Sequence, residues 1–134
     1  MSAGDFDVLI PFVEHLGLRL LEKRDGRARV AFRPGPEHLN SWQAIHGGGV
    51  MTLLDVALSS ACRGLDTTCI GATTVEMKVN FIGPARGEVI AEGRAQRAGR
   101  SLIFAEGELR DAAGRVMAKA TGTFKLVHAA GAGE

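Results

Sequence analysis

The stretch IHGGGVMTLLDVALSSA, residues 45–61, decides the fold of this chain. From Val50 to Ala61 it is apolar almost all round and rich in good helix formers, which predicts a buried helix. Its polar residues Thr52, Asp55 and Ser59 recur at i, i+3 and i+7, so they line one side of that helix. We therefore expect a core helix that presents one narrow polar stripe with a carboxylate.

Three glycines, Gly47, Gly48 and Gly49, stand directly before this predicted helix. Without side chains they let a ligand approach backbone N–H groups at the positive end of a helix. Two simpler interpretations stay open. The glycines would then be only a flexible connector, and Asp55 would belong to a solvent-facing stripe.

Composition limits the class of protein. With 134 residues and 46% hydrophobic content, residues 1–134 are expected to form one domain with a substantial core. A net charge of +1 and the lack of a Lys/Arg-rich block argue against nucleic-acid binding. No apolar run approaches the roughly 18 residues that span a membrane. The acidic start, residues 1–5, is unlike a signal peptide, so we expect a cytoplasmic protein.

Cys62 and Cys69 are the two cysteines of the chain. They lack Cys-x-x-Cys spacing and have no neighbouring histidine, so neither a metal site nor a disulfide is expected. We assign both a structural role.

The remaining segments predict a short helix, a hairpin and four further strands. Phe6 to Leu16 is expected to be helical, with Pro11 interrupting it or starting its last turns. Asp25-Gly26 favours a hairpin turn, and residues 34–40 are expected to be a loop. Short turns between the strands predict antiparallel neighbours, and residues 1–5 and 129–134 are expected to be disordered. The predicted strands are residues 18–23, 27–33, 72–82, 88–97, 101–110 and 115–127.

The strand at residues 72–82 alternates along its length. One face would carry Thr73, Val75, Met77, Val79 and Phe81, and the other Thr74, Glu76, Lys78 and Asn80. Two later strands have unusually small faces, which predict a sheet curled tightly around a central helix. These small residues are Ala91, Gly93 and Ala95 in one strand, and Ala118, Ala120 and Gly122 in the other.

Residues 40–48, NSWQAIHGG, with Asp55 nine positions after His46, resemble the Asn-x-x-Gly-x-x-His-Gly-Gly…Asp signature of the PaaI-type acyl-CoA thioesterases. The resemblance continues through residues 74–85 and 99–101 and covers about residues 6–127. It implies the α+β hot-dog fold, an antiparallel curved sheet wrapped around a long central helix, with a short N-terminal helix. Gln43 departs from the pattern, because that family usually has glycine there.

The resemblance implies thioester hydrolysis, which needs a polarised carbonyl oxygen and an attacking water or carboxylate. Backbone N–H groups at Gly47 and Gly48 suit the oxyanion, and Asp55 suits the attack. Gly47 and Asp55 are eight residues apart, about 12 Å along one helix. Both must come within about 3 Å of one reacting group, so one helix cannot supply both. We expect a site shared between two subunits of a homodimer.

By the same resemblance, Thr74 helps to place the attacking water, and Asn40 lies beside the glycines. His46 is implied to shape the loop and its hydrogen bonds, with direct base chemistry as the alternative. Arg100, with Ser101 in the Gly99-Arg100-Ser101 turn, is a candidate for contact with a phosphate of coenzyme A. A solvated surface arginine is the simpler interpretation.

We therefore expect a cytoplasmic acyl-CoA thioesterase without metal or redox cofactor, acting on aromatic or medium-chain acyl groups. Asp55 would act as general base or as nucleophile, and the sequence does not choose between them. A non-catalytic acyl or acyl-CoA binding module is the main alternative. A hot-dog dehydratase is disfavoured by its different His/acid pattern, and a lipase-type hydrolase by the missing Gly-x-Ser-x-Gly. Coenzyme A or a carrier protein, and dimer or tetramer, remain open.

Overall fold

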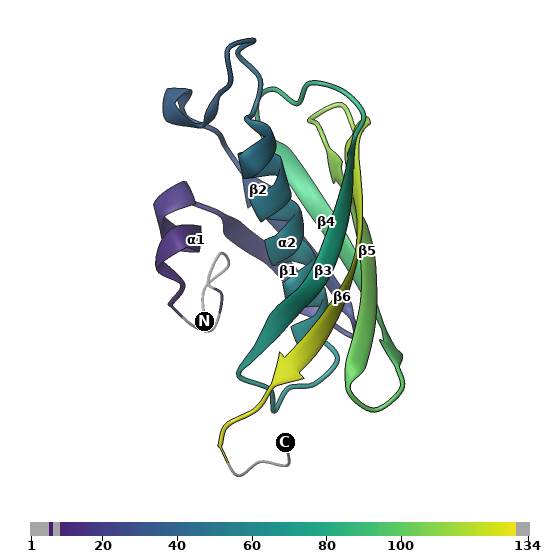
Figure 1. Ribbon diagram of the computed structural model, residues 1–134. Helices are drawn as coiled ribbons and strands as arrows, with labels where there is room; N and C mark the ends of the chain where they lie inside the picture. The colour runs from purple at the N-terminus through teal and green to yellow at the C-terminus, as the bar shows by residue number, and fades with distance from the viewer. Residues whose placement is uncertain (1–5, 7–8, 131–134) are drawn as a thin grey trace.

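An antiparallel six-stranded sheet curves around one long helix in the computed structural model, which describes residues 6 and 9–130 and, at Ala98, the backbone only (Figure 1). This arrangement confirms the predicted α+β class. The elements in chain order are α1 (Pro11–Leu16), β1 (Arg19–Arg24), β2 (Arg27–Phe32), the 3-10 helix η1 (Pro36–His38), α2 (Gly47–Arg63), β3 (Gly71–Phe81), β4 (Val89–Ala98), β5 (Leu102–Arg110) and β6 (Val116–Val127).

The strand order in the sheet is β1-β2-β4-β5-β6-β3, with every neighbouring pair antiparallel. The expectation that β3 and β4 are neighbours was therefore wrong. The connection over residues 82–88 is long enough to cross the end of the sheet, and β3 pairs with β6 instead. β3 and β1 are the two edge strands, so one side of each lacks a strand partner among the described residues.

The central helix α2 starts earlier than predicted. Gly47, Gly48 and Gly49 form its first turn instead of preceding it, and the helix runs on to Arg63. Low helix propensity of glycine had suggested a start at Val50, but His46 caps the helix and compensates for it. The glycines are thus not a flexible connector.

The N-terminal helix is shorter than predicted. α1 spans Pro11–Leu16, and Ile10 before it is extended, with φ −119° and ψ 103°. Because Pro11 disfavours helical backbone at the residue before it, it starts the helix instead of interrupting it. Phe6 lies outside the helix and is buried against the core. The predicted disorder at residues 1–5 and 131–134 lies outside the described residues.

Two connections follow their local chemistry. Asp25 and Gly26 both have positive φ, 53° and 76°, as a two-residue hairpin turn between β1 and β2 requires. The loop predicted over residues 34–40 contains the one-turn helix η1, which Pro36 starts. An isolated bridge between Leu39 and Ile45 then closes the chain back on itself before α2.

A β-bulge at Val75 changes the faces of β3. Thr74 pairs with Phe124 and Glu76 with the adjacent Thr123, so Val75 is the extra residue. The predicted alternation is therefore wrong before the bulge, since it assigned Thr74 and Glu76 to the same face. Thr74 shares the helix-facing side with Met77, which pairs with the buried Gly122.

Small residues allow α2 to lie very close to the sheet, as predicted. A Cβ added to Gly93 of β4 would stand 2.7 Å from the carbonyl oxygen of Ala57 in α2. The apolar side of α2 is fully covered there, with Leu54 and Leu58 completely buried. The core therefore lies between α2 and the concave face of the sheet. No helix in the described residues is long and apolar enough to cross a membrane.

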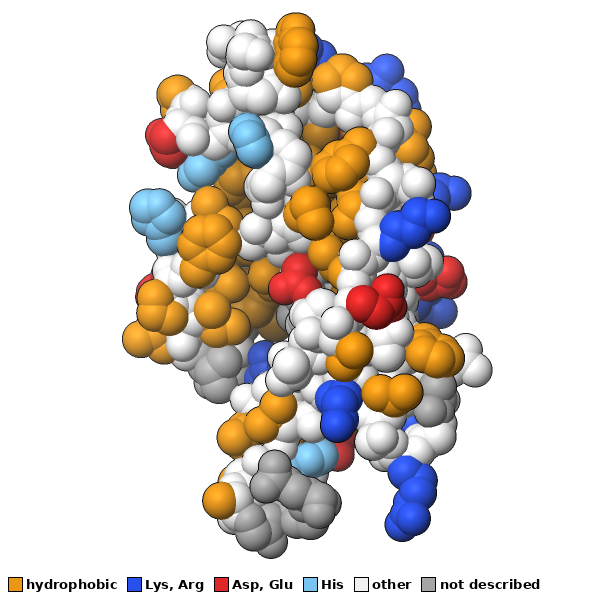
Figure 2. Space-filling model, viewed as in Figure 1, with side chains coloured by type: hydrophobic (Ala, Val, Ile, Leu, Met, Phe, Trp, Pro, Cys, Tyr) orange, Lys and Arg blue, Asp and Glu red, His pale blue; other side chains and the backbone are white. Residues whose placement is uncertain are grey.

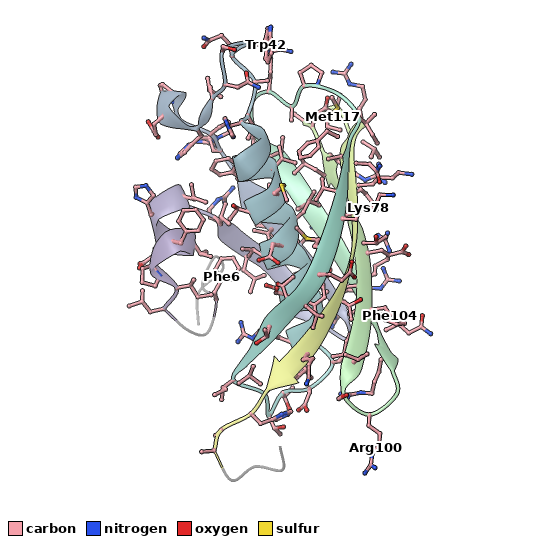
Figure 3. All side chains as sticks on the ribbon, viewed as in Figure 1. Phe6, Trp42, Lys78, Arg100, Phe104 and Met117 are labelled. Carbon is pink, nitrogen blue, oxygen red and sulfur yellow. The ribbon has the colours of Figure 1, made fainter. Side chains whose placement is uncertain are left out.

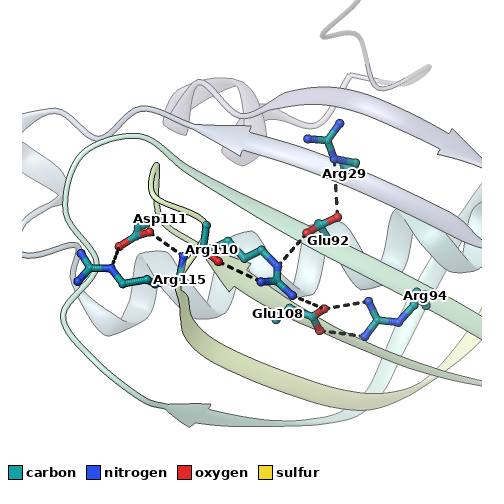
Figure 4. Close-up of polar contacts among 8 residues, drawn as sticks. Arg29, Glu92, Arg94, Glu108, Arg110, Asp111 and Arg115 are labelled. Atoms are coloured by element: carbon teal, nitrogen blue, oxygen red, sulfur yellow. Dashed lines mark hydrogen bonds and ion pairs between the residues drawn. The ribbon is translucent and has the colours of Figure 1, made fainter.

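The outer face of the sheet carries alternating charges on neighbouring strands (Figure 4). Arg94 donates two hydrogen bonds to Glu108, at 3.0 and 2.9 Å, and Arg110 contacts the same carboxylate at 3.5 Å. Arg110 also donates to Glu92 at 3.1 Å, which Arg29 approaches at 3.8 Å. The hydrogen bonds from Arg94 lower the pKa of the Glu108 carboxyl below its ordinary value of 4.5.

We predict that Gly93→Ala lowers stability by about 1–3 kcal/mol, because its Cβ would force α2 and β4 apart. Urea or thermal denaturation measures the change. Gly71→Ala is the matched control, since an added Cβ there meets nothing within 4 Å. Equal stability of the two variants would contradict the close contact between α2 and β4.

We predict that Glu108→Gln costs about 1 kcal/mol at neutral pH, because the amide cannot replace the charged fork with Arg94. A lowered folded-state pKa stabilises the fold above the unfolded-state value and loses this effect as the pH falls. The difference between the two proteins should therefore narrow below about pH 4.5. Glu106→Gln, whose contact with Arg94 is 3.9 Å long and more exposed, serves as control. A difference independent of pH would refute this origin.

Candidate active site

A pocket of about 610 Å³ lies between α1, α2 and the start of β3. Figure 2 shows hydrophobic side chains around a hollow on this side of the molecule. The polar stripe predicted for α2 faces this pocket, because Thr52, Asp55 and Ser59 all line it. The pocket is also lined by apolar residues of these three elements and of the segments just before α1 and β3: Phe6, Ile10, Phe12, Val13, Met51, Val56, Ile70, Ala72 and Met77.

Asp55 and Thr74 meet at the wall of this pocket. The Thr74 hydroxyl donates a hydrogen bond of 2.6 Å to Asp55 Oδ1. Asp55 is half-buried and Thr74 exposed, so solvent or a ligand can reach both. Because Oδ1 is held by Thr74, the carboxylate is oriented and Oδ2 remains able to accept a proton or a hydrogen bond. The bulge at Val75 makes this contact possible by turning Thr74 toward the helix.

His46 caps the start of α2. Its Nδ1 accepts a hydrogen bond of 2.8 Å from the Gly48 N–H, and its carbonyl accepts from the N–H groups of Gly49 and Val50. This leaves the Gly47 N–H without an acceptor in the part of the chain that the structure describes. Nδ1 of His46 cannot take a proton from water while it holds this bond. The contact gives His46 a structural part, and Gly47 the available donor.

Asn40 organises the loop before α2. Its side-chain oxygen accepts from the backbone N–H groups of Trp42, at 2.8 Å, and Ala44, at 3.1 Å. Gln43, inside this turn, has φ 61°, in the left-handed region that favours glycine. Gln43, which replaces the glycine usual in the family, therefore has a backbone conformation that glycine adopts more easily. The loop keeps this conformation with a side chain in place.

Arg100 and Ser101 lie apart from the other predicted site residues of this chain. They are in the turn between β4 and β5, at the opposite end of the molecule from Trp42 and the loop that precedes α2 (Figure 3). Both side chains are exposed. A single chain thus brings Asp55 and Thr74 together but not Arg100, and Gly47 lies about 12 Å from Asp55 along α2.

The structure gives the Cys62 thiol no nucleophilic environment. Burial, and secondarily the neighbouring Cys69, raises the pKa of the Cys62 thiol to about 12. Both cysteines are free thiols. Among residues 6 and 9–130, no three His, Cys, Asp or Glu side chains gather as a metal site.

Two features of the pocket were not predicted from the sequence. Phe6 and α1 cover the pocket, and Arg63 at the end of α2 lines it while donating to the Phe6 carbonyl at 3.4 Å. Arg63 was found only in the structure, although it continues the spacing of Thr52, Asp55 and Ser59 by one further turn. That continued helical spacing was the available signal.

Comparisons with known proteins agree with this fold. A model of the thioesterase superfamily matches residues 43–118, which include α2 and β3. The medium/long-chain acyl-CoA thioesterase YigI of Escherichia coli is 28% identical, over 87% of this chain and 86% of its own.

Solved structures give the same result. PA5202 from Pseudomonas aeruginosa is 30% identical with a TM-score of 0.82, over 89% of this chain and 95% of its own. A variant of the phenylacetic acid degradation protein PaaI from Thermus thermophilus is 26% identical with a TM-score of 0.77, over 88% and 99%. The predicted PaaI-type resemblance is thereby confirmed. This chain belongs to the thioesterase superfamily, has the hot-dog fold, and is a thioester hydrolase.

Proposed function

We propose that this chain hydrolyses acyl-CoA thioesters whose acyl group is aromatic or of medium length, with Asp55 as general base. The hydrogen bond between Thr74 and Asp55 at the wall of the 610 Å³ pocket is the observation that carries this proposal. The pocket volume lies in the range of small-molecule sites, roughly 300–1,000 Å³. Its walls are mainly apolar side chains, which suit an acyl group.

In the proposed reaction, Asp55 Oδ2 takes a proton from water as the water oxygen attacks the thioester carbonyl carbon. The carbonyl oxygen becomes an oxyanion and accepts a hydrogen bond from a Gly47 N–H. The C–S bond then breaks, and the leaving thiolate of coenzyme A takes the proton that Asp55 accepted, which restores the carboxylate. Thr74 keeps the carboxylate oriented throughout by donating to Oδ1. Direct attack by Asp55, through an anhydride, remains the alternative chemistry.

The Gly47 N–H in this reaction must come from a second copy of the chain, since one helix holds Gly47 and Asp55 about 12 Å apart. The edge of the sheet supports such a pairing. β3 is a long edge strand of 11 residues, and such strands are usually covered. This edge also carries exposed apolar side chains, a feature typical of protein–protein contacts. Val75 and Phe81 of β3 are 53% and 55% exposed, and Ile82 directly after the strand is 56% exposed. We propose that two copies pair along β3 and complete two equivalent sites.

We predict that Asp55→Asn lowers kcat by about 10²–10⁴, because the amide cannot accept the proton of water. Thr74→Val should lower kcat by about tenfold, through loss of one hydrogen bond to a charged group. Thiol release from a panel of acyl-CoA substrates measures both effects. Thr73→Val is the matched control, because Thr73 precedes Thr74 on the outer side of the same strand.

A folded Asp55→Asn protein with full activity would refute the assignment. Binding of acyl-CoA without hydrolysis by the wild type would favour a binding module.

We predict that Gly47→Pro removes the oxyanion donor without disrupting α2. Proline suits the first helical position, and His46 before it has φ −56° and ψ 141°, which a following proline tolerates. Loss of one such donor should lower kcat by about 10²–10³. Gly47→Ala keeps the N–H, and its Cβ would meet only the Phe81 ring at 3.5 Å, so it should retain activity.

A site shared between two chains predicts that Gly47→Pro and Asp55→Asn complement each other in mixed dimers. Co-expression of Gly47→Pro chains with Asp55→Asn chains should restore activity to about a quarter of wild type, since mixed dimers hold one intact site. Each variant alone stays inactive. No restoration in verified mixed dimers would show that Gly47 and Asp55 do not act across the dimer.

A further inference from the structure

Trp42 is an exposed aromatic residue in the loop before α2. Its side chain is 76% exposed, although a tryptophan gains more than most side chains from burial. In Figure 3 it lies at the end of the molecule beyond the start of α2. A tryptophan on the surface is typical of places that bind a ligand or another chain.

Hydrogen bonds fix the backbone on both sides of this indole. The Trp42 N–H donates to the Asn40 side-chain oxygen at 2.8 Å, and the Trp42 carbonyl accepts from Arg86 Nη2 at 3.0 Å. Further along the loop, the Ile45 N–H donates to the Ala85 carbonyl at 2.9 Å. The loop is therefore joined to residues 85–86 at two points. A backbone that is ordered in advance lowers the entropic cost of binding a ligand.

Arg86 places a positive charge beside Trp42. Its side chain is exposed, and it forms no ion pair with a carboxylate in the part of the chain that the structure describes. The guanidinium has five N–H donors, so most of them remain able to bind a ligand. Residues 39–54 and 77–87, which meet here, contain no Asp or Glu. The surface around Trp42 thus favours an anionic ligand.

An exposed indole beside a guanidinium suits a nucleotide. Every nucleobase can stack on an aromatic side chain, and arginine binds phosphate oxygens through paired N–H groups. Coenzyme A has both groups, because its pantetheine arm ends in a diphosphate and adenosine. An acyl carrier protein presents the same arm without the adenine.

The distances allow one coenzyme A molecule to reach from Gly47 to Trp42. The two residues are five positions apart in the sequence, so their Cα atoms lie within about 17 Å of each other. The diphosphate of coenzyme A is about twelve bonds from the thioester sulfur, roughly 15 Å when extended, and the adenine lies beyond it. Arg100 lies at the opposite end of the chain from Trp42 (Figure 3).

The acyl group and coenzyme A leave the reacting carbonyl in different directions. In the proposed reaction, the acyl group enters the pocket of the chain that supplies Asp55. The sulfur is on the other side of the carbonyl carbon, toward the chain whose Gly47 N–H binds the oxygen. The loop that carries Trp42 leads directly into that helix start.

We propose that Trp42 and Arg86 bind the adenosine diphosphate part of coenzyme A, on the chain that supplies Gly47. The adenine stacks on the indole, and a phosphate accepts hydrogen bonds from the Arg86 guanidinium. This assignment rests on the proposed function, since it takes the thioester to lie at Gly47. It also specifies coenzyme A as the carrier of the acyl group, in preference to a carrier protein.

Trp42 itself reports binding, because the chain has one tryptophan and no tyrosine. We expect coenzyme A to change the tryptophan emission saturably, whereas pantetheine, which lacks the adenine and the phosphates, leaves it unchanged. Arg86→Met should weaken binding of coenzyme A by about tenfold, through loss of a hydrogen bond to a charged group. Arg27→Met, at an exposed arginine in the hairpin end of β2, is the matched control. No saturable change with coenzyme A, or an equal change with pantetheine, would overturn the proposal.

Kinetics distinguish a nucleotide site from a dimer contact at Trp42. We expect Trp42→Ala to raise KM for octanoyl-CoA by about tenfold at unchanged kcat, through loss of one stacked base. Hydrolysis of the N-acetylcysteamine thioester of octanoic acid, which lacks the nucleotide, should stay unchanged. Trp42→Phe keeps an aromatic ring and should keep KM within about threefold of wild type. Phe104→Ala removes an exposed ring from β5 and serves as control.

An equal loss of activity toward both thioesters would assign Trp42 to the dimer contact and overturn the proposal. Dissociation of the dimer by Trp42→Ala, measured by size-exclusion chromatography, would do the same.

The nucleotide site and the proposed reaction fail in distinguishable ways. If no acyl-CoA is hydrolysed while coenzyme A still changes the Trp42 emission, the nucleotide site stands and the proposed reaction fails. If octanoyl-CoA is hydrolysed and Trp42→Ala leaves its KM unchanged, the reaction stands and the nucleotide site is refuted.

Discussion

Contact between the backbones of α2 and β4 determines where the rest of the molecule can lie. Gly93 faces the carbonyl of Ala57 with no room for a Cβ, and Ala91 beside it is completely buried. Because the helix lies so close, the sheet must curve to cover it, and its edge strand β3 is brought alongside the polar stripe of α2. The position of Asp55 relative to Thr74 thus depends on small residues of β4, which β5 and β6 separate from the strand that carries Thr74.

The sequence predicts the parts of this fold that are governed by local patterns. Asp25-Gly26 specifies its hairpin turn because both residues tolerate positive φ, and the polar stripe of α2 follows from helical spacing alone. The wrong predictions concern features of the fold that long-range contacts determine. Nothing local pairs β3 with β6 in preference to β4, since that choice depends on how the curved sheet closes around the helix.

The same distinction applies to the site. Alternation along β3 put Thr74 on the outer face, and only the extra residue Val75, visible in the pairing with β6, turns it toward Asp55. A bulge has no reliable signal in a single sequence. Thr74 was named as a site residue because of the family resemblance, whereas the alternation along the strand had assigned it to the other face. At Gln43 the sequence showed only a departure from the family glycine, and the structure supplies the positive φ that explains why glycine suits this position.

The N–H groups at the start of α2 explain why the proposed site requires two chains. A helix begins with N–H groups that have no intrahelical acceptor, and His46 accepts from Gly48, Gly49 and Val50 through its ring and its carbonyl. Of these N–H groups, that of Gly47 has no acceptor among the residues that the structure describes, and its lack of a side chain lets a ligand approach. The same rigid helix that orients this donor holds Asp55 two turns away, so no motion within α2 can bring the two together. A second helix start beside Asp55 would supply the donor without distorting either helix, and the exposed edge of β3 is the surface of this chain from which a second copy could present it.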